Sequence, residues 1–205
     1  MKPSKVEALI FDLGGVLIDI DFEQVFRRWL KCSNLTIDEI RQRFSMDDAY
    51  KKHERGELNA EQYFNYLREL LELKASDEEI TSGWNSIFVG EVTGSMDYVY
   101  SAKNHLPCYV FTNSNPTHQS SWSTSYPNVV KAFDQIFVSS DLGLRKPEPE
   151  AFSTISKMIG VRLEAILFFD DTVENVTAAQ AMGMQAVLVK QSSDIKQGLI
   201  AGGVL

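Results

Sequence analysis

The sequence predicts an α/β fold in which a Rossmann-like parallel sheet carries an inserted bundle of helices. Two observations lead to this prediction. Short apolar runs of strand length alternate with helical patterns in the second half of the chain. A further apolar run at 8–11 is separated from them by a long stretch of helical periodicity. We therefore expect residues 1–18 and 95–205 to form the sheet domain, and 19–94 to form a helical cap.

The first expected strand, 8–11, stops abruptly at Asp12, which is followed by Leu13, Gly14 and Gly15. This pattern is typical of a buried strand that delivers one carboxylate to a turn. Ligands of open α/β sheets bind where strands end, and an aspartate there can ligate a cation or attack an electrophile. An aspartate before glycines also suits a helix cap or a turn, so this stretch alone leaves both interpretations open.

The expected cap is helical throughout. Apolar residues recur at three- and four-residue intervals in its first helix, at Phe22, Val25, Phe26, Trp29 and Leu30. Three capping boxes mark further helix starts, at Thr36 with Glu39, Asn59 with Gln62 and Ser76 with Glu79. The last of these helices is expected to extend its apolar face through Ile87 and Phe88. An insertion after the first strand lies over the carboxyl edge of the sheet, where a lid belongs.

The second half of the chain supplies the remaining strands and their connecting helices. Strands are expected at 108–111, 134–138, 165–169 and 185–189. Helices are expected at 96–103, 150–159, 173–182 and 195–200. Strands that alternate with helices imply right-handed crossovers, so we expect a parallel sheet covered by helices on both faces.

Composition excludes several classes of function. A net charge of -8, with no long cluster of Lys and Arg, argues against a nucleic-acid or membrane-surface partner, because both require a positive patch. No stretch is long and apolar enough to cross a membrane. Cys32 and Cys108 lie far apart and form no metal spacing or disulfide framework, which favours a reducing cytoplasmic setting.

Polar side chains follow four of the expected strands. They are Asp12, Thr112, Asn113, Lys146, Asp170 and Asp171. In a parallel sheet these positions converge at one edge, where the carboxylates would repel one another without a cation. Hard oxygen ligands at an open site suit Mg²⁺, and a hydroxyl, an amide and an ammonium beside it can bind a phosphoryl group. The arrangement indicates phosphoryl transfer.

These residues stand in four motifs: FDLGG, FTNSN, RKPE and FFDDTVEN. Together they resemble the haloacid dehalogenase (HAD)-like hydrolase superfamily, in the subfamily whose helical cap follows the first motif. Three segments, 53–57, 84–88 and the SSDLGLRKPE stretch, look most similar to bacterial phosphatases of the α-D-glucose-1-phosphate phosphatase type. The resemblance implies a HAD-like catalytic core.

For the metal site, the resemblance implies that Asp12 is the nucleophile and also a ligand of Mg²⁺. Asp171 would be the second carboxylate ligand, and the Gly14 carbonyl would also bind the metal. Asp170 would hold Lys146 or a metal-bound water, and Asn175 would be an outer partner of the metal.

For the phosphoryl group, the resemblance implies that Thr112 and Asn113 bind its oxygens, while Lys146 neutralises the nucleophile and the transferring group. Arg55 of the cap is a candidate substrate ligand, as is its neighbour His53. The same cap segment also fits an exposed helix end closed by a glycine.

One position departs from the common phosphatase pattern. Where a second aspartate would act as acid and base, this chain has Gly14. Such help is worth roughly two to four orders of magnitude in rate. A sugar hemiacetal phosphate such as glucose 1-phosphate has a better leaving group than an alkyl phosphate, so we expect it to be favoured. Asp19, Asp21 and His118 are alternative proton donors, although His118 also suits the surface of a helix. Trp122 suits either packing, which we expect, or stacking on a sugar.

The sequence therefore predicts a Mg²⁺-dependent phosphatase, monomeric or dimeric, that hydrolyses a small phosphorylated metabolite through an aspartyl-phosphate on Asp12. The alternative is a catalytically weak sensor or binding protein of a phosphorylated ligand, because of Gly14. Dehalogenation is disfavoured, since displacement at carbon needs no divalent cation. A phosphomutase is disfavoured because both of its half-reactions need acid and base help.

Overall fold

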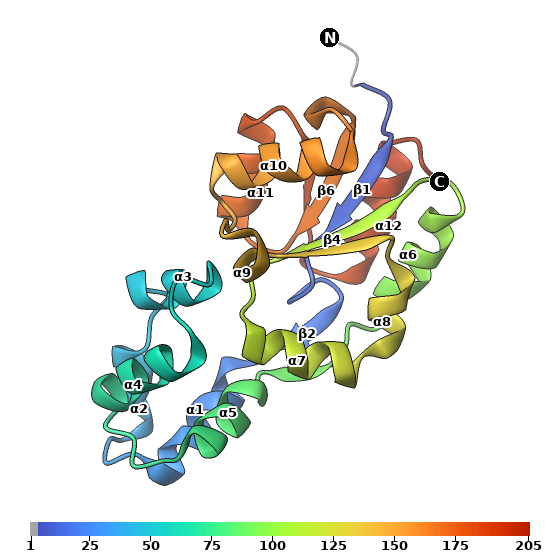
Figure 1. Ribbon diagram of the computed structural model, residues 1–205. Helices are drawn as coiled ribbons and strands as arrows, with labels where there is room; N and C mark the ends of the chain where they lie inside the picture. Colours follow the sequence, from blue (N-terminus) through green and yellow to red (C-terminus); the bar gives the residue numbers. More distant parts are fainter. Residues whose placement is uncertain (1–3) are drawn as a thin grey trace.

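A five-stranded parallel sheet forms the centre of the molecule, in the strand order β5-β4-β1-β6-β7 (Figure 1). The computed structural model describes residues 4–205, so residues 1–3 of the expected sheet domain lie outside the described residues. The strands are β1 (Ala8–Phe11), β4 (Cys108–Thr112), β5 (Gln135–Val138), β6 (Ile166–Asp170) and β7 (Gln185–Leu188). The predicted α/β fold with a parallel sheet is confirmed.

Helices cover both faces of this sheet. One face carries α6 (Ser95–Lys103), α7 (Pro116–Ser125), α8 (Pro127–Ala132) and α12 (Ser192–Ala201), and the other carries α10 (Pro149–Ile159) and α11 (Val173–Ala181). The turns α9 (Ser139–Leu142) and η2 (Leu163–Ala165) complete this part of the chain. In β1, Leu9 and Phe11 pack into the first layer and Ile10 into the second. Burial on both faces explains why this strand is apolar without alternation.

The segment between β1 and α6 contains a group of helices with its own apolar core (Figure 1). They are α1 (Phe22–Trp29), η1 (Leu30–Cys32), α2 (Ile37–Arg43), α3 (Asp48–Glu54), α4 (Ala60–Leu71) and α5 (Asp77–Asn85). All three predicted capping boxes are formed, at the starts of α2, α4 and α5. At the centre of this core, Trp29 stacks on Trp84 with ring centroids 5.5 Å apart.

A short antiparallel ribbon joins the two ends of this helical segment. It pairs β2 (Ile18–Ile20) with β3 (Phe88–Glu91), with Ile20 opposite Phe88. The expectation that Ile87 and Phe88 continue the preceding helix was wrong, because α5 ends at Asn85. Their side chains still pack against the apolar core of the helices, which is why their spacing in the sequence matched that of the preceding helix. We propose that the ribbon marks the boundary of the cap, 19–94.

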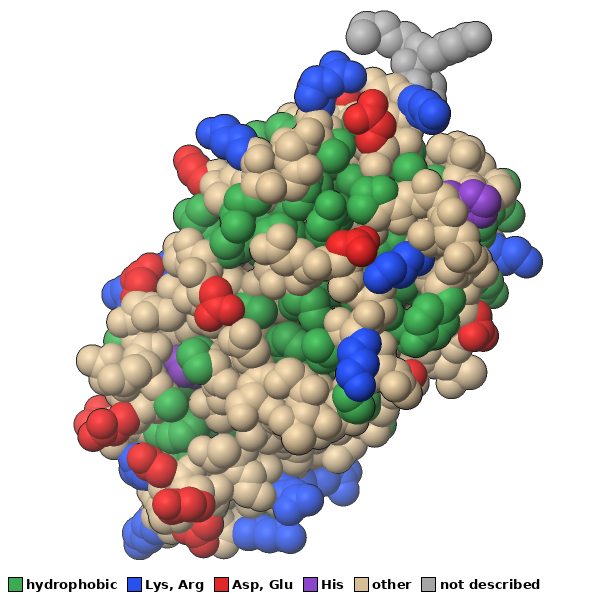
Figure 2. All heavy atoms as spheres, turned by 45° about the vertical axis from the view of Figure 1, so that its right-hand side comes forward, with side chains coloured by type: hydrophobic (Ala, Val, Ile, Leu, Met, Phe, Trp, Pro, Cys, Tyr) green, Lys and Arg blue, Asp and Glu red, His purple; other side chains and the backbone are tan. Residues whose placement is uncertain are grey.

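The surface carries charges of both signs. On the face shown in Figure 2, Lys and Arg side chains are dispersed, with Asp and Glu between them. Within residues 4–205, every helix is too short or too polar to cross a lipid bilayer.

Candidate active site

A pocket of about 580 Å³ lies where the carboxyl end of the sheet meets the helical segment. Its lining includes most of the side chains that the sequence placed at strand ends, namely Asp12, Thr112, Asn113, Lys146 and Asp171, together with Asn175 of α11. Helical-segment residues such as Phe22, Tyr50 and Glu54 line it as well. The pocket therefore combines a polar base from the sheet with a wall from the helices.

Lys146 is fully buried at the base of this pocket. Its Nζ lies 2.8 Å from Asp12 Oδ1 and 2.7 Å from Asp170 Oδ2, and it donates to the Phe111 carbonyl at 2.8 Å. The three N–H groups of the ammonium are thus matched by three acceptors. Burial alone would lower the pKa of Lys146, but the two carboxylates raise it above its usual value. Lys146 is a fixed cation between them.

Asp12 directly follows β1 and is itself buried. Its Oδ1 accepts the Leu13 backbone N–H at 2.7 Å in addition to Lys146. Burial raises the pKa of Asp12 to about 8 against the opposing attraction of Lys146, and the negative charges of Asp170 and Asp171 add to the rise. Further positive charge nearby would stabilise the ionised form of Asp12.

The carboxylates of Asp12, Asp170 and Asp171 offer oxygen atoms that all lie within 4.8 Å of one another. Three carboxylates and the single ammonium of Lys146 leave an excess of two negative charges when all are ionised. A divalent cation balances that excess, and carboxylate oxygens are the ligands that Mg²⁺ prefers. The donor set therefore fits Mg²⁺.

Asp170 accepts more hydrogen bonds than the other two carboxylates. Asn175 Nδ2 donates to both of its oxygens, at 3.0 and 3.1 Å, and the Thr172 N–H donates to Oδ1 at 2.8 Å. Asp170 therefore holds Lys146, Asn175 and the backbone of Thr172 together. The roles of Asp170 and Asn175 around a metal stay predictions. Asp171 is exposed and lies so close to Gly15 that a Cβ there would overlap its carboxylate.

Thr112 and Asn113 lie together beside this cluster, at the end of β4. The Asn113 side chain, however, is occupied elsewhere: Nδ2 donates to the Lys146 carbonyl at 2.9 Å, and Oδ1 accepts the Lys146 N–H at 2.8 Å. Its amide side chain therefore fixes the loop that carries Lys146.

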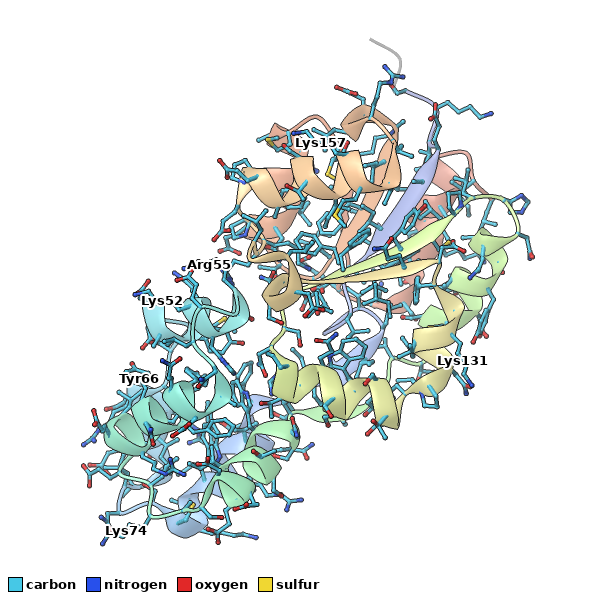
Figure 3. All side chains as sticks on the ribbon, viewed as in Figure 1. Lys52, Arg55, Tyr66, Lys74, Lys131 and Lys157 are labelled. Carbon is cyan, nitrogen blue, oxygen red and sulfur yellow. The ribbon has the colours of Figure 1, made fainter. Side chains whose placement is uncertain are left out.

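Arg55 does not line the pocket. Its Nε pairs with Glu57 at 2.5 Å and its NH1 with Glu148 at 3.0 Å, so it lies at the end of α3 facing the sheet domain (Figure 3). His53 is also absent from the lining and is buried, stacked on Tyr63 with centroids 4.4 Å apart. The expectation of an exposed helix end is wrong for His53. Gly56 does adopt a positive φ of 71°, as a helix-closing glycine does.

His118 lies in helix α7 as expected, but it is buried and lines the pocket, so the surface assignment was wrong. Its Nε2 donates to the Trp84 carbonyl at 3.2 Å, and burial lowers the pKa of His118 to about 3. Of the other suggested proton donors, Asp21 caps helix α1 and Asp19 is exposed on β2, and neither lines the pocket. Trp122 is a buried packing residue, as expected, that also reaches the pocket.

The structure adds pocket residues that sequence reasoning did not select. Glu54 and Arg145 both line the pocket and form an ion pair at 2.8 Å. Ile20 occupies the space beside Gly14, where a Cβ would lie 3.3 Å from its Cδ1. The position of Arg145, immediately before Lys146 in the GLRKPEP loop, was a signal that could have identified it.

The chain is similar over nearly its whole length to proteins of known activity. It is 25% identical over 200 residues to a D-ribitol-5-phosphate phosphatase of Bacteroides thetaiotaomicron, covering 95% of this chain and 97% of the relative. It is 25% identical over 204 residues to a phosphatase of Mycobacterium tuberculosis, covering 95% of this chain and 92% of that protein.

Solved structures agree with these sequence matches. A HAD-family enzyme of Bacteroides thetaiotaomicron, in complex with magnesium and inorganic phosphate, superposes with a TM-score of 0.79 at 26% identity, covering 91% of this chain and 95% of that one. Residues 6–183, which contain all four motifs, match the family of haloacid dehalogenase-like hydrolases. The chain therefore belongs to the haloacid dehalogenase-like hydrolases.

Proposed function

We propose that this protein is a Mg²⁺-dependent phosphatase of a small phosphorylated metabolite, with a sugar phosphate such as glucose 1-phosphate as its preferred substrate class. The observation that carries the proposal is the buried Lys146, held between Asp12 and Asp170 at the base of the pocket. The similarity to two phosphatases and to a HAD-family enzyme with bound magnesium and phosphate supports it. The free state of Cys32 and Cys108 supports a cytoplasmic location.

Asp12 is the proposed nucleophile. The Leu13 N–H and Lys146 both bind Oδ1, which orients the carboxylate. Attack by Asp12 on phosphorus forms an acyl phosphate and breaks the bond to the leaving oxygen, which takes up a proton. Water then attacks phosphorus and releases a proton to solvent, and the bond between phosphorus and the Asp12 oxygen breaks, so that inorganic phosphate leaves and the Asp12 carboxylate is restored.

Lys146, Thr112 and the backbone N–H of Asn113 are the proposed ligands of the transferring phosphoryl group. Fixed donors of this kind stabilise the charge that develops on the phosphoryl oxygens. Asp12, Asp171 and the Gly14 carbonyl would hold Mg²⁺, which would supply the additional positive charge that the ionised carboxylates and the phosphate require. Asp170 pairs with Lys146 and so holds it in place, and Asn175 donates a hydrogen bond to Asp170.

At the position where the common phosphatase pattern has a proton-donating aspartate, this chain has Gly14 and therefore no side chain. Ile20 occupies the space beside Gly14, and the His118 Nε2–H is already bonded to the Trp84 carbonyl. A leaving group that departs without enzymatic protonation is then favoured. This is the argument for a hemiacetal phosphate over an alkyl phosphate.

Phosphate release from a panel of phosphorylated sugars, polyols and nucleotides tests the proposal, with and without Mg²⁺. The parent should release phosphate only with the metal, and Asp12→Asn should lower the rate to background because an amide cannot form the acyl phosphate. Release that persists in Asp12→Asn would refute the role of Asp12. Absence of release from every member would overturn the phosphatase assignment and favour a binding role.

A further inference from the structure

Glu54 and Arg145 form an ion pair in the wall of the pocket, close to the phosphoryl-binding residues. Arg145 Nε donates to Glu54 Oε2 at 2.8 Å, and only 12% of the arginine side chain and 7% of the glutamate side chain are exposed. Glu54 is the last residue of α3, and Arg145 directly precedes Lys146. The pair therefore joins the helical segment to the loop that carries the phosphoryl-binding lysine.

The backbones on both sides of this pair are held in place. Ser139 Oγ donates to the Glu54 carbonyl at 2.6 Å, and the Arg145 N–H donates to Glu148 Oε2 at 3.1 Å. Gly56 lies against the Ser140 carbonyl so closely that a Cβ would stand 2.7 Å from its oxygen. A charged pair fixed in this way presents its remaining donors and acceptors to the pocket in one arrangement.

Much of the hydrogen-bonding capacity of the pair is not used by the protein. Among residues 4–205, Nε is the one guanidinium nitrogen of Arg145 with a hydrogen-bond partner, so its terminal N–H groups are available. Glu54 Oε2 accepts from Arg145, whereas a carboxylate offers about four acceptor sites. Donors and acceptors thus lie side by side on a buried wall.

We propose that the Glu54–Arg145 pair is the specificity-determining subsite that binds hydroxyl groups of the leaving group. A diol donates and accepts at the same time, which matches a carboxylate beside a guanidinium. The neighbouring pocket residues Ile20, Phe22 and Phe88 offer an apolar surface to the carbon face of the same molecule. The substrate class is a phosphate monoester of a polyhydroxylated alcohol or sugar; this inference rests on the proposed phosphatase function.

The test compares kcat and KM for glucose 1-phosphate with those for p-nitrophenyl phosphate, whose leaving group carries no additional hydroxyl. Glu54→Gln removes the charge with little change in shape. Arg145→Lys keeps a cation but removes the planar pair of terminal N–H groups. Each variant should lower kcat/KM for glucose 1-phosphate about tenfold to a hundredfold, mainly through KM, because hydrogen bonds to charged groups are individually worth that much. For p-nitrophenyl phosphate we expect both constants to stay near those of the parent.

Glu72→Gln is the matched control. It makes the same chemical change at an ion pair within the helical segment, Arg43 with Glu72 at 3.0 Å, and neither residue lines the pocket. This variant should leave both substrates unaffected, and thermal unfolding should show that all variants fold. Equal losses on both substrates in Glu54→Gln and Arg145→Lys, or no loss, would overturn the subsite. A parent without Mg²⁺-dependent hydrolysis of p-nitrophenyl phosphate would instead overturn the phosphatase proposal, and the subsite with it.

Discussion

Replacing Gly14 by aspartate should supply the acid and base help that the common phosphatase pattern places at this position. The backbone at Gly14 accepts a side chain, because its φ lies outside the left-handed region, unlike that of Gly15 at 73°. A Cβ at Gly14 would lie 3.3 Å from Ile20 Cδ1 and 3.6 Å from Ile20 Cγ2. Its principal neighbour is thus the end of one apolar side chain, which needs to move by only a few tenths of an ångström.

The expected gain depends on the leaving group. General acid catalysis contributes roughly a hundredfold to ten-thousandfold, which corresponds to about 3 to 5 kcal/mol of activation free energy. Displacement of Ile20 and the added negative charge near Asp12 both oppose the change, so we place the gain toward the lower end of that range. It should be largest for alkyl phosphates and absent for p-nitrophenyl phosphate, whose leaving group departs without a proton.

The assay is kcat/KM for a series of phosphate monoesters with leaving groups of increasing basicity, at saturating Mg²⁺. Gly14→Asn is the control, because its side chain has nearly the same shape as aspartate but cannot transfer a proton. The parent and Gly14→Asn should lose activity steeply as the leaving group becomes more basic, and Gly14→Asp should lose it less. If Gly14→Asp and Gly14→Asn are equally active on alkyl phosphates while both fold and respond to Mg²⁺, the reasoning about this position is refuted.

Two further predictions concern the metal site and the buried histidine. Gly15→Ala should raise the Mg²⁺ concentration needed for half-maximal activity, since a Cβ there would overlap the Asp171 carboxylate; unchanged Mg²⁺ activation would contradict this. Because burial lowers the pKa of His118 from 6.5 to about 3, the unfolded chain binds a proton that the folded chain does not. The free energy of unfolding should therefore fall as the pH drops below about 6.5, by about 1.4 kcal/mol per pH unit. In denaturant unfolding of His118→Gln, the free energy of unfolding should change less steeply with pH, by the equivalent of about one proton. An equal dependence on pH in the parent and the variant would show that His118 does not cause it.

The sheet and the base of the pocket could be predicted from the sequence because both depend on local pattern. A strand buried on both faces is a continuous apolar run, and its end is marked by the first polar residue. Parallel topology then brings these ends to one edge, which is how Asp12 and Asp171 were expected to meet although they are far apart in sequence. Capping boxes are equally local, since the two side chains of each lie three residues apart.

The wall of the pocket could not be predicted in the same way. Glu54 and Arg145 are 91 positions apart, and their contact depends on how the helices sit over the sheet. Helical periodicity gives the buried face of a helix but not the part of the sheet domain that its end will touch. The ribbon of β2 and β3 was missed for a related reason: its strands are short, and Phe88 also packs against the helical core.

Asn113 shows that the sequence can predict the position of a residue without predicting its role. Asn113 lines the pocket beside Thr112 and Lys146, but both polar atoms of its side-chain amide bind the Lys146 backbone. The same loop residue is held at its Nζ by Asp12 and Asp170, so side chains from the ends of three strands fix one lysine. A residue type at a strand end therefore identifies a site, whereas its role depends on which of its donors and acceptors the fold already occupies. By that criterion we expect the terminal N–H groups of Arg145, which have no hydrogen-bond partner among residues 4–205, to be better candidates for binding substrate than the Asn113 side chain.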